Sequence, residues 1–131
     1  ISGKQTLVRS RGLGDVYRRL KLLRQDVSQF RERLQGLRNE IRAKETQSSL
    51  VDEEVEGLET LLSKGLSPKT RVLELKREQA RLNGDREALV SQVAATRIQI
   101  GEIELEINQL TDGFREMVMT EMRDVQTQIA E

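Results

Sequence analysis

The fold of this chain is decided by one stretch near its midpoint, Leu61-Leu62-Ser63-Lys64-Gly65-Leu66-Ser67-Pro68-Lys69-Thr70, which contains the only proline. Gly65 can adopt the left-handed backbone conformation that ends a helix. Ser67 can cap a following helix that has Pro68 at its first position. A loop of about four residues between two long helices leaves room only for an antiparallel turn. The stretch therefore predicts the tip of a helical hairpin.

The composition excludes several kinds of chemistry. The 131 residues include no Cys, no His and no Trp, which excludes zinc sites, thiol nucleophiles and His-based acid–base pairs. Asp and Glu are common, but charges on a helix face are usually solvated, so we expect no enzyme and no cofactor. The 22 Lys and Arg balance the 22 Asp and Glu, which argues against a nucleic-acid-binding surface. A charged fraction of 34% with 2% aromatic residues is typical of a long helix or coiled coil.

Before the turn, apolar residues recur in alternating steps of three and four, and only Lys44 and Ser48 interrupt them. Such a spacing over about seven heptads predicts a left-handed coiled-coil seam. Residues 1–14 form a weaker lead-in because they contain three glycines, and Asp15 offers a new helix cap, so the first arm is predicted at about 15–63. Its seam consists of Leu13, Val16, Leu20, Leu23, Val27, Phe30, Leu34, Leu37, Ile41, Val51, Val55, Leu58 and Leu62.

After the predicted tip at 64–68, the return arm at 69–131 repeats the pattern. Polar slots fall at Gln79, Arg86 and Thr96, and a four-residue stutter near Phe114 is expected to unwind the supercoil locally. The predicted fold class is thus all-α, a long antiparallel two-helix coiled-coil hairpin. The seam of the return arm consists of Val72, Leu75, Leu82, Leu89, Val93, Ile100, Ile103, Ile107, Leu110 and Phe114, followed by Val118, Met122, Val125 and Ile129.

Folding the two arms about the tip predicts a constant register. The residue numbers of seam partners add to about 133 or 134, as for Val51 with Leu82. Ser48 then lies opposite Arg86. A polar layer of this kind fixes register and orientation at some cost in stability, and a direct functional role is the alternative.

Ile98 and Leu105 do not belong to this seam. They lie seven residues apart on the side of the return arm that faces away from the first arm. An apolar stripe there predicts that another helix packs on it, either a third segment or a neighbouring copy. The alternative is that these are scattered exposed apolar residues, which are common on protein surfaces.

No apolar run approaches the roughly 18 residues of a membrane span, and no signal peptide precedes Ile1. The chain also lacks a starting Met. We therefore expect it to be a segment of a larger protein.

The run from Leu61 to Glu78, followed by Leu82 and Gly84, resembles the hairpin tip of HlyD-type membrane fusion proteins. Further similarity lies in the return arm, and the specific match covers about residues 58–131. The sequence looks most like the branch that serves type I secretion of proteases and lipases in Gram-negative bacteria. The matching return-arm segments are Gln99-Ile100-Gly101-Glu102, residues 105–110 and Phe114-Arg115.

The resemblance implies a periplasmic adaptor, anchored in the inner membrane, that pairs with an ABC transporter and docks its tip on a TolC-like outer-membrane channel. It also implies self-association into a ring. In the drug-efflux branch an Arg, a Leu and a Ser at the tip touch the channel. Leu61 and Ser67 are similar to the last two, with a spacing one residue shorter, whereas the Arg position falls near Gly57.

The tip is the site predicted to contact the channel. Leu66 is an apolar residue on a short polar loop, and Lys64, Lys69 and Arg71 form a local positive cluster. The alternative is that the loop residues only build the turn. The predicted docking residues are Leu61, Gly65, Leu66, Ser67, Pro68 and Lys69.

Other functions remain open for a rod of this composition. A cytoplasmic coiled-coil spacer or scaffold is the main alternative, although its zinc-hook variety needs a Cys pair that is absent. A prefoldin-like chaperone is the other alternative, but such helix tips expose several apolar residues, whereas this tip offers Leu66 among Ser, Lys and Thr.

Overall fold

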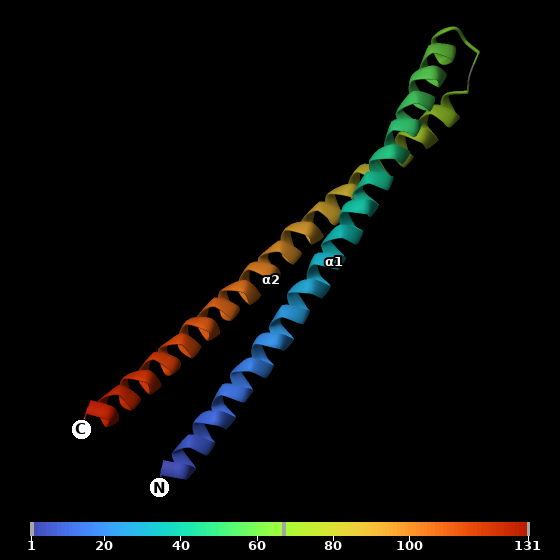
Figure 1. Ribbon diagram of the computed structural model, residues 1–131. Helices are drawn as coiled ribbons and strands as arrows, with labels where there is room; N and C mark the ends of the chain where they lie inside the picture. The colour runs from blue at the N-terminus through green and yellow to red at the C-terminus, as the bar shows by residue number, and fades with distance from the viewer. Residues whose placement is uncertain (1, 67, 131) are drawn as a thin grey trace. The chain divides into compact units, whose positions relative to one another are not determined.

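The computed structural model describes the backbone of residues 2–66 and 68–130 and, within these, the side chains of residue 3 and of residues 10–66 and 68–130. Helix α1 spans Ser2–Ser63 and helix α2 spans Lys69–Ala130, each 62 residues long. The two helices are joined by a single turn and run in opposite directions (Figure 1). The structured part of the chain contains no strand. The predicted all-α hairpin is confirmed.

The chain divides into two compact units. The turn unit comprises Glu32–Arg97 and contains the end of α1, the turn and the beginning of α2. The terminal unit comprises Ile1–Arg31 together with Ile98–Glu131. Each unit pairs one stretch of α1 with one stretch of α2, so the two can be described separately.

The turn unit is closed by the predicted seam. Leu82 is the most buried of its apolar residues at 2% exposure, and every predicted seam residue of the unit is buried or half-buried. Thr96 occupies a polar slot and is also buried, but its hydroxyl donates to the carbonyl of Gln92 at 2.8 Å. That hydrogen bond removes the cost of burying an unsatisfied polar group. The buried apolar residues here are Leu37, Val55, Val72, Leu75, Leu82 and Leu89.

In the terminal unit the seam prediction holds only in part. Leu23, Val27 and Ile100 are buried, and the remaining predicted positions through Val118 are half-buried. Beyond Val118 the prediction is wrong, because the last three predicted seam residues are exposed. In the predicted register Met122 faces Arg11 and Gly12, neither of which is an apolar seam residue. The exposed residues are Met122, Val125 and Ile129.

Helix α1 shows no break at Asp15. It runs through the glycine-rich lead-in from Ser2 onward, and Asp15 instead forms an ion pair with Arg18 one turn further along the same helix. Asp15 therefore does not act as an N-cap.

Ion pairs across the seam flank the apolar contacts in both units. In the terminal unit Arg31 pairs with Glu104 at 2.9 Å, and in the turn unit Lys76 pairs with Glu59 at 2.8 Å. The residue numbers of both pairs add to 135, close to the 133 or 134 predicted for the seam, whereas other ion pairs between the helices give sums from 125 to 131. These side chains are largely exposed, so each pair contributes at most about 1 kcal/mol, and the register is set by the apolar seam.

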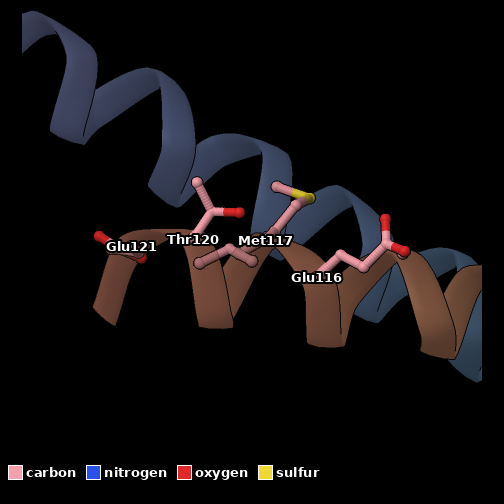
Figure 2. Close-up of a pocket in the computed structure, with 6 residues that line it drawn as sticks. Glu116, Met117, Thr120 and Glu121 are labelled. Atoms are coloured by element: carbon pink, nitrogen blue, oxygen red, sulfur yellow. The ribbon is translucent and has the colours of Figure 1, made fainter. Parts of the chain in front are cut away.

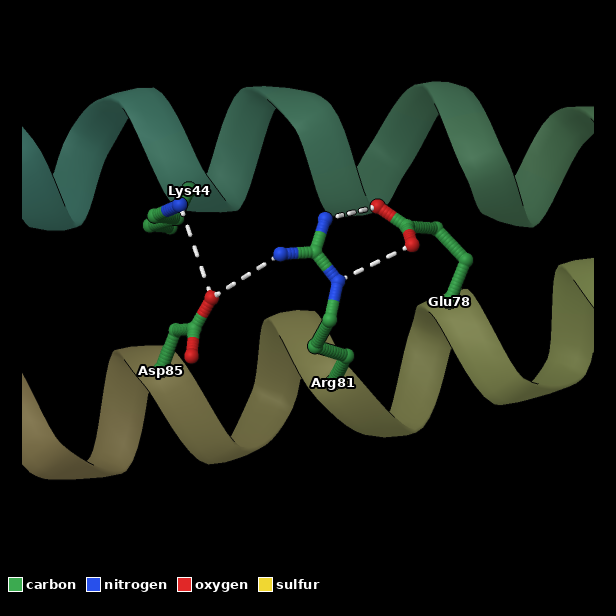
Figure 3. Close-up of polar contacts among 4 residues, drawn as sticks. All are labelled: Lys44, Glu78, Arg81 and Asp85. Carbon is green, nitrogen blue, oxygen red and sulfur yellow. Dashed lines mark hydrogen bonds and ion pairs between the residues drawn. The ribbon is translucent and has the colours of Figure 1, made fainter.

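The polar layer of the turn unit is held by charged neighbours on both helices (Figure 3). Lys44 pairs with Asp85 at 3.5 Å, and Arg81 bonds Glu78 at 3.0 Å while reaching Asp85 at 3.8 Å. The hydrogen bond from Arg81 lowers the pKa of Glu78, which therefore stays ionised to lower pH than usual. Arg86, expected opposite Ser48, bonds Glu45 at 3.0 Å. The layer thus has its charges compensated across the seam.

The register predicts a disulfide. Val51 is half-buried and Leu82 is buried in the same unit, and the chain has no other cysteine. We expect Val51→Cys combined with Leu82→Cys to form an intrachain bond on mild oxidation, because facing seam residues of a coiled coil approach one another closely, and a disulfide needs a Cα separation of about 4.4 to 6.8 Å. Non-reducing electrophoresis of a dilute sample measures it. Exclusive formation of dimers would mean that the arms pair between molecules.

Candidate functional site

The turn begins with a helix terminus of the Schellman type. Gly65 has a positive φ of 73°. Its amide donates to the carbonyl of Leu62 at 2.9 Å, and the amide of Leu66 donates to the carbonyl of Leu61 at 2.8 Å. These two bonds satisfy carbonyls that the end of α1 would otherwise leave without partners. The predicted role of Gly65 as the residue that ends the first helix is confirmed.

Helix α2 starts immediately after Pro68. The carbonyl of Pro68 accepts a hydrogen bond from the amide of Arg71 at 3.2 Å, so the proline opens the first turn of the helix even though regular helix begins at Lys69. Ser67, predicted to cap this helix and to contact a partner, lies outside the described residues. The path of the turn is therefore defined by Gly65 on one side and Pro68 on the other.

The turn presents leucine to solvent. Leu66 is 71% exposed, and Leu61, in the last two turns of α1, is 41% exposed. Gly65, Pro68 and Lys69 are exposed as well. By contrast Leu62, the last seam residue of α1, is half-buried. The predicted docking residues that the structure describes are thus all exposed, on the turn and on the helix ends that adjoin it.

The positive cluster predicted at the turn is smaller in the structure. Arg71 pairs with Glu74 at 3.3 Å and with Glu54 at 4.0 Å, so its charge is compensated within the hairpin. Lys64 and Lys69 have no ion pair within residues 10–66 and 68–130. The positive charge available to a partner is therefore carried by these two lysines.

Ile98 and Leu105 are in the terminal unit and face solvent, as predicted. They are 63% and 58% exposed. The structure adds Leu50, an α1 residue of the turn unit that is 57% exposed and that sequence reasoning did not single out. Because Leu50 lies outside the predicted seam, its exposure could have been predicted from the sequence.

A shallow groove lies in the terminal unit between the start of α1 and the end of α2 (Figure 2). Leu13 and Met117 give it an apolar lining, and Glu116 and Glu121 line it with carboxylates. It coincides with the stutter, where Met117 becomes 41% exposed. The groove reflects the loosening of the seam at this end of the hairpin.

Fold and turn together define a coiled-coil hairpin that presents an apolar residue at its turn. Comparison with known families identifies the family of this hairpin. The model of the AprE long α-helical hairpin matches residues 3–131. The chain belongs to this AprE hairpin family.

Two known proteins illustrate the relationship. Over 104 residues the chain is 36% identical to PrsE, a type I secretion system membrane fusion protein of Rhizobium meliloti (strain 1021), an alignment that covers 79% of this chain and 24% of PrsE. The crystal structure of the soluble domain of LipC, a membrane fusion protein of a type I secretion system, is similar with a TM-score of 0.78. That match covers 97% of this chain and 59% of the LipC chain at 24% identity, which establishes the common fold. The chain therefore spans a minor part of PrsE and just over half of the LipC chain.

Neither helix of the described chain is apolar over a sufficient length to cross a membrane.

Replacing a glycine by alanine is expected to have opposite effects on stability at the turn and inside α1. Gly65→Ala should lower the free energy of unfolding by about 1 kcal/mol, because a side chain disfavours the left-handed region. Gly57→Ala is the matched control: it lies inside α1, has nothing within 4 Å of an added Cβ, and should gain about 0.5 to 1 kcal/mol. Urea unfolding followed by circular dichroism measures both. Equal effects of the two substitutions would contradict the role assigned to Gly65.

Proposed function

We propose that this chain is the hairpin of a periplasmic adaptor protein that links an inner-membrane ABC transporter to a TolC-like outer-membrane channel in type I protein secretion. Membership of the AprE hairpin family and the identity to PrsE support this assignment. The observation that carries the docking role is the exposure of Leu66 on the turn. The family match also favours the adaptor over a cytoplasmic coiled-coil spacer.

The turn is the proposed contact with the channel. Burial of Leu66 against a partner would gain roughly 1.5 to 3 kcal/mol, and Leu61 would extend the apolar contact along the last turns of α1. Gly65 and Pro68 fix the backbone that presents Leu66, and Ser67 is proposed as a polar contact. The alternative is that these residues only build the turn, since a hydrophobic residue after the glycine is common in a Schellman terminus. The docking proposal is favoured because Leu66 remains 71% exposed there.

The two lysines of the turn favour an acidic partner. Lys64 and Lys69 flank Leu66, and no carboxylate within the described residues pairs with either of them. Charges of this kind speed association with a surface of opposite sign, and their effect weakens as salt screens them. Docking is therefore expected to be faster at low ionic strength.

The outward face of the terminal unit is the proposed contact with neighbouring hairpins. Ile98 and Leu105 need an apolar cover, and α1 and α2 are the only helices in the described part of the chain. A neighbouring copy supplies that cover if the adaptors assemble side by side in a ring. The hairpin would then stand in the periplasm of a Gram-negative bacterium, with the whole protein anchored in the inner membrane.

The docking proposal predicts the effect of Leu66→Asp. The substitution leaves Gly65 and Pro68 unchanged, so the melting temperature of the hairpin should hold while secretion by the whole protein falls at least tenfold, because a charge replaces the buried apolar contact. The measurement is the amount of secreted substrate in the culture medium.

Val90→Asp is the control for this experiment, because Val90 is 39% exposed on α2 and lies away from the turn. It should leave secretion close to normal. Normal secretion by the Leu66→Asp variant would rule out docking through the turn.

The neighbour contact predicts the effect of changing Ile98 and Leu105 together to Glu. Both side chains are exposed, so helicity and melting temperature should hold while assembly of the whole protein weakens. Circular dichroism and analytical ultracentrifugation measure the two properties. A large fall in melting temperature would instead place these residues inside the fold.

A further inference from the structure

Four glycines lie inside the helices without a reason in the hairpin itself. A glycine in a helix interior is unfavourable relative to alanine. Yet an added Cβ would meet nothing within 4 Å at any of them, and all four are exposed. No contact within the described chain therefore requires the missing side chain. The four are Gly36, Gly57, Gly84 and Gly101.

Three of these glycines, Gly36, Gly57 and Gly84, lie in the turn unit and belong to a second heptad stripe on each helix, which faces away from the seam. The α1 stripe contains a single charged residue, Glu53, whereas the chain as a whole is 34% charged. All members of both stripes are exposed. The α1 stripe is Gly36, Asn39, Ala43, Thr46, Leu50, Glu53, Gly57 and Thr60, and the α2 stripe is Leu73, Arg77, Ala80, Gly84, Glu87, Ser91 and Ala94.

Three polar members of the α1 stripe, Asn39, Thr46 and Thr60, already form hydrogen bonds within their own helix. The hydroxyls of Thr46 and Thr60 donate to the carbonyls of Arg42 and Glu56, each at 3.0 Å. The side-chain oxygen of Asn39 accepts hydrogen bonds from Gln35 and Arg42. A helix packed on this face would leave none of these groups without a partner.

The two stripes match each other when two copies stand side by side with their turns level. In that arrangement a residue of α1 faces the same level of the neighbouring α2 as of its own, so partner numbers again add to 133 or 134. Leu50 then meets Gly84, and Arg77 meets Gly57. The other pairs in this register each contain at least one Ala or Thr: Ala43 with Ser91, Asn39 with Ala94, Thr46 with Glu87, Ala80 with Glu53, and Thr60 with Leu73.

The charges of the stripes match as well. Arg77 on α2 and Glu53 on α1 have no ion pair or hydrogen bond within the described residues of the chain. In the same arrangement Arg77, opposite Gly57, lies one helical turn from Glu53 of the neighbour. Opposite charges that are unpaired in one copy are thus brought together between two.

We propose that the outward stripe of α1 in the turn unit binds the outward stripe of α2 of a second copy, with the turns level and Leu50 seated over Gly84. The contact is heterologous, because each copy uses a different helix toward each neighbour, and it builds a row or closed ring. This inference deepens the self-association proposed above by naming the partner face and the register. It does not depend on docking through Leu66.

Crosslinking between differently tagged copies of the full-length protein in the cell tests the register. Leu50→Cys in one copy and Gly84→Cys in the other should form a mixed disulfide, because the chain has no cysteine of its own. Leu50→Cys with Ser91→Cys is the matched control: Ser91 lies in the same stripe one heptad away, a rise of about 10.5 Å, which exceeds the separation that a disulfide spans.

The expected result is a Leu50–Gly84 link at least tenfold stronger than the Leu50–Ser91 link. Absence of any link, or a stronger link between two Leu50→Cys copies or two Gly84→Cys copies, would overturn the proposal. Gly84→Leu gives a second measurement: assembly should weaken while the melting temperature of the chain does not fall, and Leu50→Gly in the same chain should restore assembly. Undiminished assembly of the Gly84→Leu variant would equally overturn it.

Secretion by the Leu66→Asp variant separates the two proposals. If the Leu66→Asp variant does not secrete and the Leu50–Gly84 link is missing, the adaptor function stands and the stripe contact is rejected. If the variant secretes normally and the link is strong, the stripe contact stands and docking through the turn is rejected.

Discussion

The seam between α1 and α2 is the constraint on which the structure depends. With two helices in the described chain, each helix can bury one face against the other, so one line of side chains supplies nearly all of the apolar contact. This explains why polar residues in the seam, such as Lys44 and Arg86, have charged partners on the opposite helix. An uncompensated charge in the seam would remove a large part of the small free energy of unfolding of such a hairpin.

The turn converts this seam into a defined surface. Because Gly65 ends α1 through two backbone hydrogen bonds and Pro68 opens α2, neither helix can extend into the loop or shorten without losing those bonds. The position of Leu66 relative to the seam is thereby fixed. A residue presented on so short a turn loses little conformational freedom when it binds, which lowers the cost of docking.

Periodicity predicted the fold almost completely because a coiled coil is itself a periodic object. The positions of Leu23, Leu82 and Ile100 follow from steps of three and four alone. The failure at Met122 has a physical cause: spacing reveals which residues share a face but not whether the opposite helix offers apolar cover. The same limit applies to Arg71, whose charge appeared available from sequence until the structure placed Glu54 and Glu74 beside it. At the candidate site, Gly65 was predictable because its backbone role is local, and the exposure of Leu61 follows from the predicted seam, which contains Leu58 and Leu62 but not Leu61.

The four outward glycines are unfavourable for the isolated hairpin. Four unfavourable helix positions would reduce the stability of a molecule that has only one seam, and replacement by alanine meets no obstacle within the described chain. A selective reason therefore has to come from outside the single hairpin. Close approach of a second helix is such a reason, since a glycine admits a leucine or an arginine from the facing helix where a larger residue would hold the two backbones apart. The hairpin then has two seams of different character: an internal one, rich in leucine and valine, that folds the chain, and an external one, built from glycine, small residues and single large side chains, that is complete only in an assembly.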